Sequence, residues 1–242
     1  MLSTAKATVQ WLLDALYPRR CVACGQFCAE PLCQRCRATW RLILPPMCGR
    51  CGAPLRALGE CHYCLGHTYA FDRAVCASVY ADSVRSALLN LKFRRWKRAA
   101  QPLAQLLWQA LQQVGEDKLK ADGIVPVPIH PMRRAWRGFN QAELLAYALA
   151  LCSGVPVWTD VLRRRFYRRP QVGLSQTERA QNVYGAFEVV HPEQVRNRVL
   201  WLLDDVFTTG STLDACATAL KQAGASCVVA LAVARDLVEL RE

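Results

Sequence analysis

The residues best suited to chemistry follow one apolar run near the C-terminal end of the chain. Residues 199–203 are apolar without alternation, which is typical of a strand buried on both faces of a parallel sheet. Two carboxylates, Asp204 and Asp205, follow where we expect this strand to end, because adjacent side chains converge on one ligand only where the pleat breaks. A turn of small residues then opens a predicted helix: Thr208, Thr209, Gly210, Ser211 and Thr212. Backbone N–H groups at such a turn, with the positive end of the helix behind them, form a phosphate site.

Acids beside a phosphate site indicate a class of ligand. Carboxylates accept hydrogen bonds from vicinal hydroxyls while the turn holds a phosphate, so the pattern suggests a sugar phosphate. For the turn alone, an ordinary strand followed by a capped helix would be the simpler interpretation. The chain has no G-x-G-x-x-G after a strand and no G-K-[ST], so dinucleotide and P-loop sites are not predicted.

The cysteines form the second pattern with chemistry, since eight of the 13 fall in C-x-x-C pairs. The pairs are Cys21/Cys24, Cys33/Cys36, Cys48/Cys51 and Cys61/Cys64. Each pair supplies two soft ligands from one turn and Zn²⁺ takes four, so the spacing predicts two structural zinc sites in tandem. Pairing in chain order is the simplest assignment, and interleaved pairing stays open. A disulfide framework is the rival, but no secretory signal is expected here, and reduced thiols bind metal instead.

Arginine-rich segments suit the recognition of anions. Residues 130–140, expected to form a loop after a strand at 124–129, carry Arg133, Arg134 and Arg137, which suit bidentate phosphate recognition. A merely soluble basic loop is the alternative. A further basic run interleaved with aromatic residues could stack on and neutralise a single strand of nucleic acid. Its members are Lys92, Arg94, Arg95, Trp96, Lys97 and Arg98. A solvated corner with its aromatic rings tucked inward explains that run equally well.

Composition narrows the class of protein. The formal net charge is +12 and the pI about 9.3, so the chain favours anionic partners. With 52% hydrophobic and 21% charged residues it is predicted to be globular. No apolar run approaches the roughly 18 residues that a membrane span needs, and a signal peptide is not expected at the N-terminus.

The order of the predicted elements indicates an α/β fold with a parallel sheet whose ligand lies at the carboxyl ends of the strands. Strands are expected at 71–80, 124–129, 187–190, 199–203 and 226–233, and helices at 83–93, 101–114, 141–151 and 213–223. We expect an amphipathic N-terminal helix within 1–20, a double zinc ribbon at 21–68 and an α/β domain at 70–242.

The string from the apolar strand to Thr212 resembles the PRPP motif of type I phosphoribosyltransferases, and nearly the whole chain resembles the ComF family, including GntX-like proteins. The matching motifs are D-A-L-Y-P at 14–18, L-K-F at 91–93, V-P-V-P at 125–128, R-G-F-N-Q-A-E at 137–143 and L-D-D-V-F-T-T-G-S-T at 203–212, besides the zinc ribbons. This resemblance implies a type I phosphoribosyltransferase-like sheet flanked by helices behind a small double zinc ribbon.

The resemblance also implies roles for residues. Asp204 and Asp205 would grip the ribose 2′- and 3′-hydroxyls of Mg²⁺-bound PRPP, and the turn at 208–212 its 5′-phosphate. The arginines of 130–140 would hold the pyrophosphate, and a mobile loop that includes Gln171 and Arg179 would close over the ligand. The family further implies a cytoplasmic bacterial protein that acts in natural transformation or in the use of external DNA.

Two hypotheses remain open at this point. In one, the protein is an active phosphoribosyltransferase whose acceptor the sequence does not identify. In the other, it binds PRPP without turnover while the ribbons and basic runs hold single-stranded DNA or a competence helicase or other DNA-processing protein.

Overall fold

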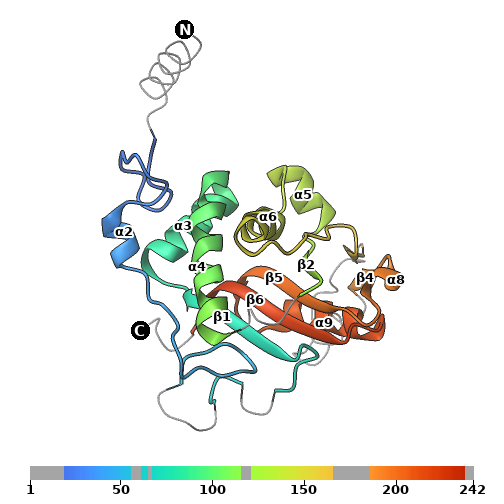
Figure 1. The fold of residues 1–242 in the computed structure, drawn as a ribbon. Helices are drawn as coiled ribbons and strands as arrows, with labels where there is room; N and C mark the ends of the chain where they lie inside the picture. The colour runs from blue at the N-terminus through green and yellow to red at the C-terminus, as the bar shows by residue number, and fades with distance from the viewer. Residues whose placement is uncertain (1–18, 56–60, 65–66, 116–120, 166–185, 238–242) are drawn as a thin grey trace, which may run out of the picture.

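The protein is built around a parallel sheet of four strands in the order β1-β6-β5-β2 (Figure 1). The computed structural model describes residues 19–55, 61–64, 67–115, 121–165 and 186–237. The strands of the sheet are β1 (Arg73–Val79), β2 (Gly123–Pro126), β5 (Val199–Phe207) and β6 (Cys227–Arg235). The central pair β5 and β6 is almost wholly buried, as the unbroken apolar runs predict. The predicted α/β parallel sheet is therefore confirmed.

Helices cover both faces of the sheet, and each face has its own core (Figure 1). On one face lie α3 (Asp82–Phe93), α4 (Ala100–Val114) and α6 (Gln141–Ser153), which pack on Trp201 and Leu203. On the other face α9 (Ser211–Gln222) packs on Leu200 and Leu202. Among the described residues, no helix is both long and apolar enough to cross a membrane.

The two halves of the cysteine-rich segment join different cores. Cys21 and Cys36 pack with the core of α3, α4 and α6, whereas Cys48 and Cys51 pack with the core of α9. Short helices complete this part and the edges of the fold: α2 (Gln34–Ala38), the 3-10 turn η1 (Lys97–Ala99) and α8 (Pro192–Val195). The N-terminal segment up to residue 18, including the predicted amphipathic helix, lies outside the described residues.

The strand expected at 187–190 forms, but outside the parallel sheet. β3 (Leu162–Arg164) and β4 (Phe187–Val189) make a separate antiparallel pair. Glu188 on β4 forms ion pairs with Arg163 and Arg165, so cross-strand charges stabilise the pair. The predicted mobile-loop residues Gln171 and Arg179 fall outside the described residues.

Two expectations about local structure were wrong. The strand predicted to end at 203 continues to Phe207, because β6 pairs with it as far as Arg235. The segment 130–140, expected to be a loop, contains helix α5 (Pro131–Arg137). Its start is capped by His130, whose Nδ1 accepts a hydrogen bond from the N–H of Met132 at 3.3 Å, and Gly138 ends it with φ of 79°.

Candidate functional site

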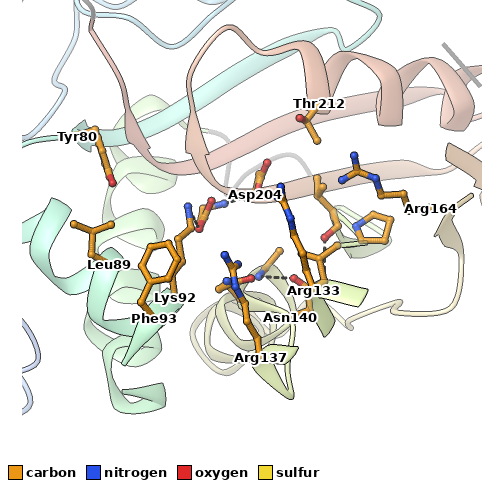
Figure 2. Close-up of a pocket in the computed structure, with 16 residues that line it drawn as sticks. Tyr80, Leu89, Lys92, Phe93, Arg133, Arg137, Asn140, Arg164, Asp204 and Thr212 are labelled. Atoms are coloured by element: carbon orange, nitrogen blue, oxygen red, sulfur yellow. Dashed lines mark hydrogen bonds and ion pairs between the residues drawn. The ribbon is translucent and has the colours of Figure 1, made fainter. Parts of the chain in front are cut away.

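A cavity of about 370 Å³ opens at the carboxyl ends of β2 and β5 (Figure 2). Figure 2 shows Thr212 and Asp204 on one side of it and Arg137 and Asn140 on the other. The side chains that line it come from α3, α5, α6, β3, β5 and α9, from the residues that directly follow β1 and β2, and from the residue that directly precedes α6. They are Tyr80, Leu89, Lys92, Phe93, Val127, Pro128, Ile129, Arg133, Arg137, Asn140, Gln141, Ala142, Arg164, Asp204, Asp205 and Thr212.

The acidic pair lines this cavity because β5 extends beyond the end of the neighbouring strand β2. The pairing of β2 with β5 ends at Pro126, opposite Leu203, so the next two residues of β5 have a strand partner only on the β6 side. Asp204 and Asp205 both line the cavity, although they belong to one continuous strand. A ligand can therefore reach the pair because β2 ends at Pro126, and not because β5 ends there.

The two carboxylates have different electrostatic environments. Asp205 is 7% exposed, and its Oδ2 lies 2.6 Å from Nζ of Lys92 on α3. Asp204 accepts a hydrogen bond at Oδ1 from the N–H of Asp205 at 2.8 Å. Burial, and then the neighbouring negative charge of Asp205, raise the pKa of Asp204 to about 7. A bound cation near Asp204 would favour the ionised form of its carboxyl group.

Positive charge surrounds the acids. The cavity is lined by four cationic side chains, Arg133, Arg137, Arg164 and Lys92, and by only two carboxylates, those of the acidic pair. The guanidinium of Arg137 lies over the ring of Phe93, 5.2 Å from its centroid, and burial and the charge of Arg133 lower the pKa of Arg137. An excess of cations over acids in one cavity suits a ligand with several negative charges.

Several buried donors in the cavity wall have no partner among the described residues. They are Nε of Arg137, Nε of Arg164 and Nε2 of Gln141. A buried donor without an acceptor costs about 1–3 kcal/mol, so these groups favour a ligand that brings oxygen acceptors. Asn140, by contrast, is fully engaged: it donates to the carbonyl of Val127 at 3.0 Å and caps α6 through the N–H of Ala142.

The predicted phosphate turn lies between β5 and α9. Gly210 has φ of 84° and precedes the first residue of the helix, and Thr209 Oγ1 lies 2.8 Å from Ser211 Oγ. Of the five residues predicted from sequence, Thr212 lines the cavity. A Cβ on Gly210 would lie 2.6 Å from Cζ of Phe207, so this turn requires glycine both for its backbone angle and for space.

Some of the other predicted anion-binding residues line the cavity, and others bind elsewhere in the protein. Arg133 and Arg137 line the cavity, whereas Arg134 pairs with Glu143, with Nη1 and Oε1 2.6 Å apart. In the basic run, Lys92 points into the cavity and pairs with Asp205. Arg95 donates to the carbonyl of Trp136 at 2.8 Å.

The remainder of the basic run lies near the same corner. Lys97 lies 5.3 Å from the centroid of the Phe139 ring, and Arg94 lies 5.8 Å from that of Trp96. Arg94 and Arg98 are exposed, and Phe93, although 56% exposed, lines the cavity. The run is therefore partly a wall of the cavity and partly a solvated corner.

The eight paired cysteines gather in two clusters that follow chain order. The first cluster is Cys21, Cys24, Cys33 and Cys36, the second is Cys48, Cys51, Cys61 and Cys64, and within each the sulfurs lie within 4.8 Å of one another. Tetrahedral zinc with Zn–S bonds near 2.3 Å needs sulfurs about 3.8 Å apart. The sulfurs of Cys24 and Cys33 are 3.8 Å apart, and those of Cys48 and Cys64 are 3.6 Å apart, so both clusters fit zinc.

Several residues of the cavity could not be recognised from the sequence. Arg164 carries no signal of its own for a ligand, and its place in β3 brings it to the site. Gln141 adjoins the capping residue of α6, a signal for the helix start that says nothing of a ligand. Tyr80 and Leu89 carried no signal, because the packing of α3 on the sheet alone places them here.

The fold and site define an α/β protein with a parallel sheet, a charged cavity at its carboxyl edge and two four-cysteine clusters in its N-terminal part. Residues 12–65 match the family described as "Double zinc ribbon domain". The chain is 32% identical over 168 residues to Competence protein F of Haemophilus influenzae, covering 68% of this chain and 73% of that protein. It is 33% identical over 179 residues to the DNA utilization protein YhgH of Salmonella typhimurium, covering 73% of this chain and 78% of that protein.

The chain therefore belongs to the ComF family. Among solved structures it is similar to the glutamine PRPP amidotransferase of B. subtilis, with a TM-score of 0.39 and 24% identity over 55% of this chain and 26% of that one.

Proposed function

We propose that the cavity binds PRPP together with Mg²⁺. The observation that carries this proposal is the meeting, in one cavity of about 370 Å³, of an adjacent pair of carboxylates with Arg133, Arg137, Arg164 and Lys92. Carboxylates accept hydrogen bonds from sugar hydroxyls, while guanidinium groups bind phosphate oxygens in pairs. A phosphorylated sugar carrying a pyrophosphate supplies both kinds of partner.

Each part of this ligand has residues suited to it. Asp204 and Asp205 would accept from the ribose hydroxyls or offer oxygen ligands to Mg²⁺, which favours carboxylates together with phosphate oxygens. Arg133, Arg137 and Arg164 would hold the pyrophosphate. The turn at 208–212 at the start of α9 would hold the 5′-phosphate through its N–H groups.

The protein's role, on this proposal, is in DNA uptake or in the use of external DNA. Support comes from the names of its relatives, a competence protein and a DNA utilization protein. Its partners would be single-stranded DNA, held by exposed cations such as Arg94 and Arg98, and a competence helicase or other DNA-processing protein. The site of action would be the cytoplasm.

An active phosphoribosyltransferase is the second candidate. In this case an acceptor bonds to C1 of the ribose as the C1–O bond to pyrophosphate breaks, and the arginines and the metal stabilise the negative charge on the leaving group. The burial of Asp204 beside Asp205 favours this candidate, because it raises the pKa of Asp204 to about 7, and a group with a pKa near the working pH suits proton transfer.

Calorimetric titration of PRPP with Mg²⁺ into the zinc-loaded protein tests the binding proposal. We expect Arg133→Met to weaken binding at least tenfold, because Arg133 lines the cavity. Arg134→Met is the matched comparison, since Arg134 is held by Glu143. An equal loss in both variants would show that Arg134 also contacts the ligand. No loss in Arg133→Met would refute the placing of the pyrophosphate.

Two further measurements separate the candidates. Pyrophosphate released in step with a glycosylated product, in a screen of bases, ammonia sources and single-stranded DNA, would establish an enzyme and refute a pure binder. For DNA, log K should fall linearly with log salt concentration. The double variant Arg94→Met, Arg98→Met should reduce that slope by about 1.4, since each phosphate contact on a single strand contributes about 0.7.

A further inference from the structure

Two side chains hold the carbonyl oxygens of three successive residues at the start of the phosphate turn, Phe207, Thr208 and Thr209. Arg235, at the end of β6, is 3% exposed, and its Nη1 donates to the carbonyl of Phe207 at 3.1 Å, to that of Thr208, and to that of Asp236 at 3.0 Å. The next carbonyl, of Thr209, accepts from the hydroxyl of Tyr69 at 3.2 Å. Successive residues of the turn are thus fixed by two side chains from distant parts of the chain.

The hydrogen bonds to these carbonyls also fix the direction of the neighbouring N–H groups. In a trans peptide the C=O of one residue and the N–H of the next point in opposite directions. Holding the carbonyls of Phe207 and Thr208 on Arg235 therefore turns the N–H groups of Thr208 and Thr209 away from Arg235, and holding that of Thr209 on Tyr69 turns the N–H of Gly210 away from Tyr69. Successive N–H groups turned the same way form a concave anion site.

Aromatic packing holds the same segment in place. Tyr69 stacks on Phe71 with ring centroids 4.7 Å apart, and both rings meet the edge of Phe207, at 6.0 and 6.1 Å. The guanidinium of Arg235 lies over the Phe207 ring, 4.5 Å from its centroid. Gly210 sits against Phe207 and Tyr69, with no room for a Cβ. The turn is therefore confined by side chains as well as by hydrogen bonds.

These side chains are tied to the second zinc cluster. Tyr63 lies between the ligands Cys61 and Cys64, and its ring centroid is 5.9 Å from Cζ of Arg235. The N–H of His67 donates to the carbonyl of Cys64 at 2.9 Å, at the start of the segment that leads to Tyr69. Ala70 then donates to Oδ1 of Asp214, in the first turn of α9, at 2.6 Å.

The first zinc cluster braces a different wall of the site. Asn90 on α3 donates to the carbonyls of Val22 and Ala23 at 2.8 and 3.0 Å, and Ser83 donates to that of Cys36 at 2.6 Å. These contacts hold the helix that carries Lys92, on the opposite face of the sheet from α9. Loss of this cluster should thus leave the phosphate turn in place.

We infer that Arg235 and Tyr69 are positioning residues that preset the turn at 208–212 for a phosphate group, and that zinc in the second cluster holds them in position. This inference rests on the proposed function for its ligand but not for its geometry. The second ribbon would then be part of the machinery that shapes the binding site, and its loss would disable the site without removing any residue that contacts the ligand.

Amide hydrogen exchange of Asp214, followed by NMR, tests the geometry without any ligand. The N–H of Asp214 donates to the carbonyl of Gly210 at 2.8 Å, so its exchange reports on the turn. We expect Arg235→Met to speed this exchange at least tenfold and Tyr69→Phe about threefold, with Arg235→Lys between Arg235→Met and the unsubstituted protein. Arg198→Met and Tyr147→Phe, outside the cavity lining, are the matched controls and should leave it unchanged.

The dependence on zinc is tested by Cys64→Ser against Cys24→Ser. The second-cluster variant should speed exchange at Asp214 and weaken PRPP binding about tenfold or more. The first-cluster variant should leave exchange at Asp214 unchanged, even if a looser α3, which carries Lys92, weakens PRPP binding. Tyr69→Phe removes one hydroxyl and leaves the aromatic packing, so it remains informative if Arg235→Met or Cys64→Ser fails to fold.

Unchanged exchange at Asp214 in Tyr69→Phe and in the Arg235 variants would overturn the inference, as would equal effects of the two cysteine variants on this exchange. Faster exchange as predicted, in a protein that binds no PRPP even when unsubstituted, would support the positioning role and refute the proposed function.

Discussion

Lys92 is the counter-ion of the acidic pair, and its replacement by methionine should destabilise the folded protein by an amount that the structure allows us to estimate. Lys92 and Asp205 are 22% and 10% exposed at their side chains, and the charged atoms are 2.6 Å apart. Methionine preserves most of the aliphatic volume and removes the charge. The variant then leaves the Asp205 carboxylate buried beside Asp204.

The gross attraction at this distance is about 6 kcal/mol with an effective dielectric constant of about 20. The cost of desolvating both groups offsets part of it. Removing one partner of a buried pair typically costs 3–5 kcal/mol, and because this cavity admits solvent we expect the lower end, about 3 kcal/mol.

Lys221→Met is the matched control. Lys221 pairs with Asp72 at 2.7 Å, but the side chains are 26% and 44% exposed, so its loss should cost at most about 1 kcal/mol. Urea unfolding of the zinc-saturated proteins, followed by circular dichroism, measures both changes in the free energy of unfolding. A loss in Lys92→Met no larger than that in Lys221→Met would refute the role of Lys92 as the buried counter-ion.

Three further predictions follow from the site. Since the folded-state pKa of Asp204 is raised to about 7, ionising it opposes folding; stability should fall as pH rises from about 4 to about 7, and Asp204→Asn should flatten this part of the unfolding profile. A strong zinc chelator should open residues 21–64 to protease, because ribbons of this size need their metal to fold; unchanged protection in mass-mapped digests would contradict the zinc assignment. Gly210→Ala should lower the free energy of unfolding by about 2–3 kcal/mol, because the backbone is strained there and the new Cβ would overlap Phe207. Gly115 has a φ of 74° and open space around it, so Gly115→Ala should lower it by only about 1 kcal/mol. Equal losses for the two variants in chemical denaturation would show that the turn relaxes around the new side chain.

The parts of this protein with a local signature could be predicted from its sequence. The apolar run of β5, the small residues before α9 and the C-x-x-C spacing depend on neighbours in the chain, and these elements formed as expected. Chain-order pairing of the cysteines was the simplest of the alternatives left open, and the structure adopts it.

What the sequence could not provide depends on contacts between distant segments. β5 continues past 203 because β6 extends to Arg235, and the acids become accessible because β2 stops at Pro126. The helix α5 did carry local signals, a proline at its first position and Gly138 at its end, and these were outweighed by the expectation of a loop. Lys92 was part of a basic run for which a nucleic-acid surface and a solvated corner stayed equally open, whereas the docking of α3 points it at Asp205.

The buried contacts of Arg235 were likewise invisible in the sequence. An arginine at the end of an apolar strand is expected to be exposed to solvent. Here its guanidinium is buried against the face of the Phe207 ring and donates hydrogen bonds to carbonyls at the start of the phosphate turn. Charged residues at strand ends next to a candidate ligand loop are therefore worth testing as positioning groups.

The central claim is that the acidic pair and the cations around it bind PRPP with Mg²⁺. Its most direct test is calorimetric titration of PRPP, with and without Mg²⁺, into the zinc-loaded protein and into the double variant Asp204→Asn, Asp205→Asn. We predict Mg²⁺-dependent binding with one ligand per chain that the folded double variant loses. Equal binding by the double variant, or no binding by the unsubstituted protein, would contradict the claim.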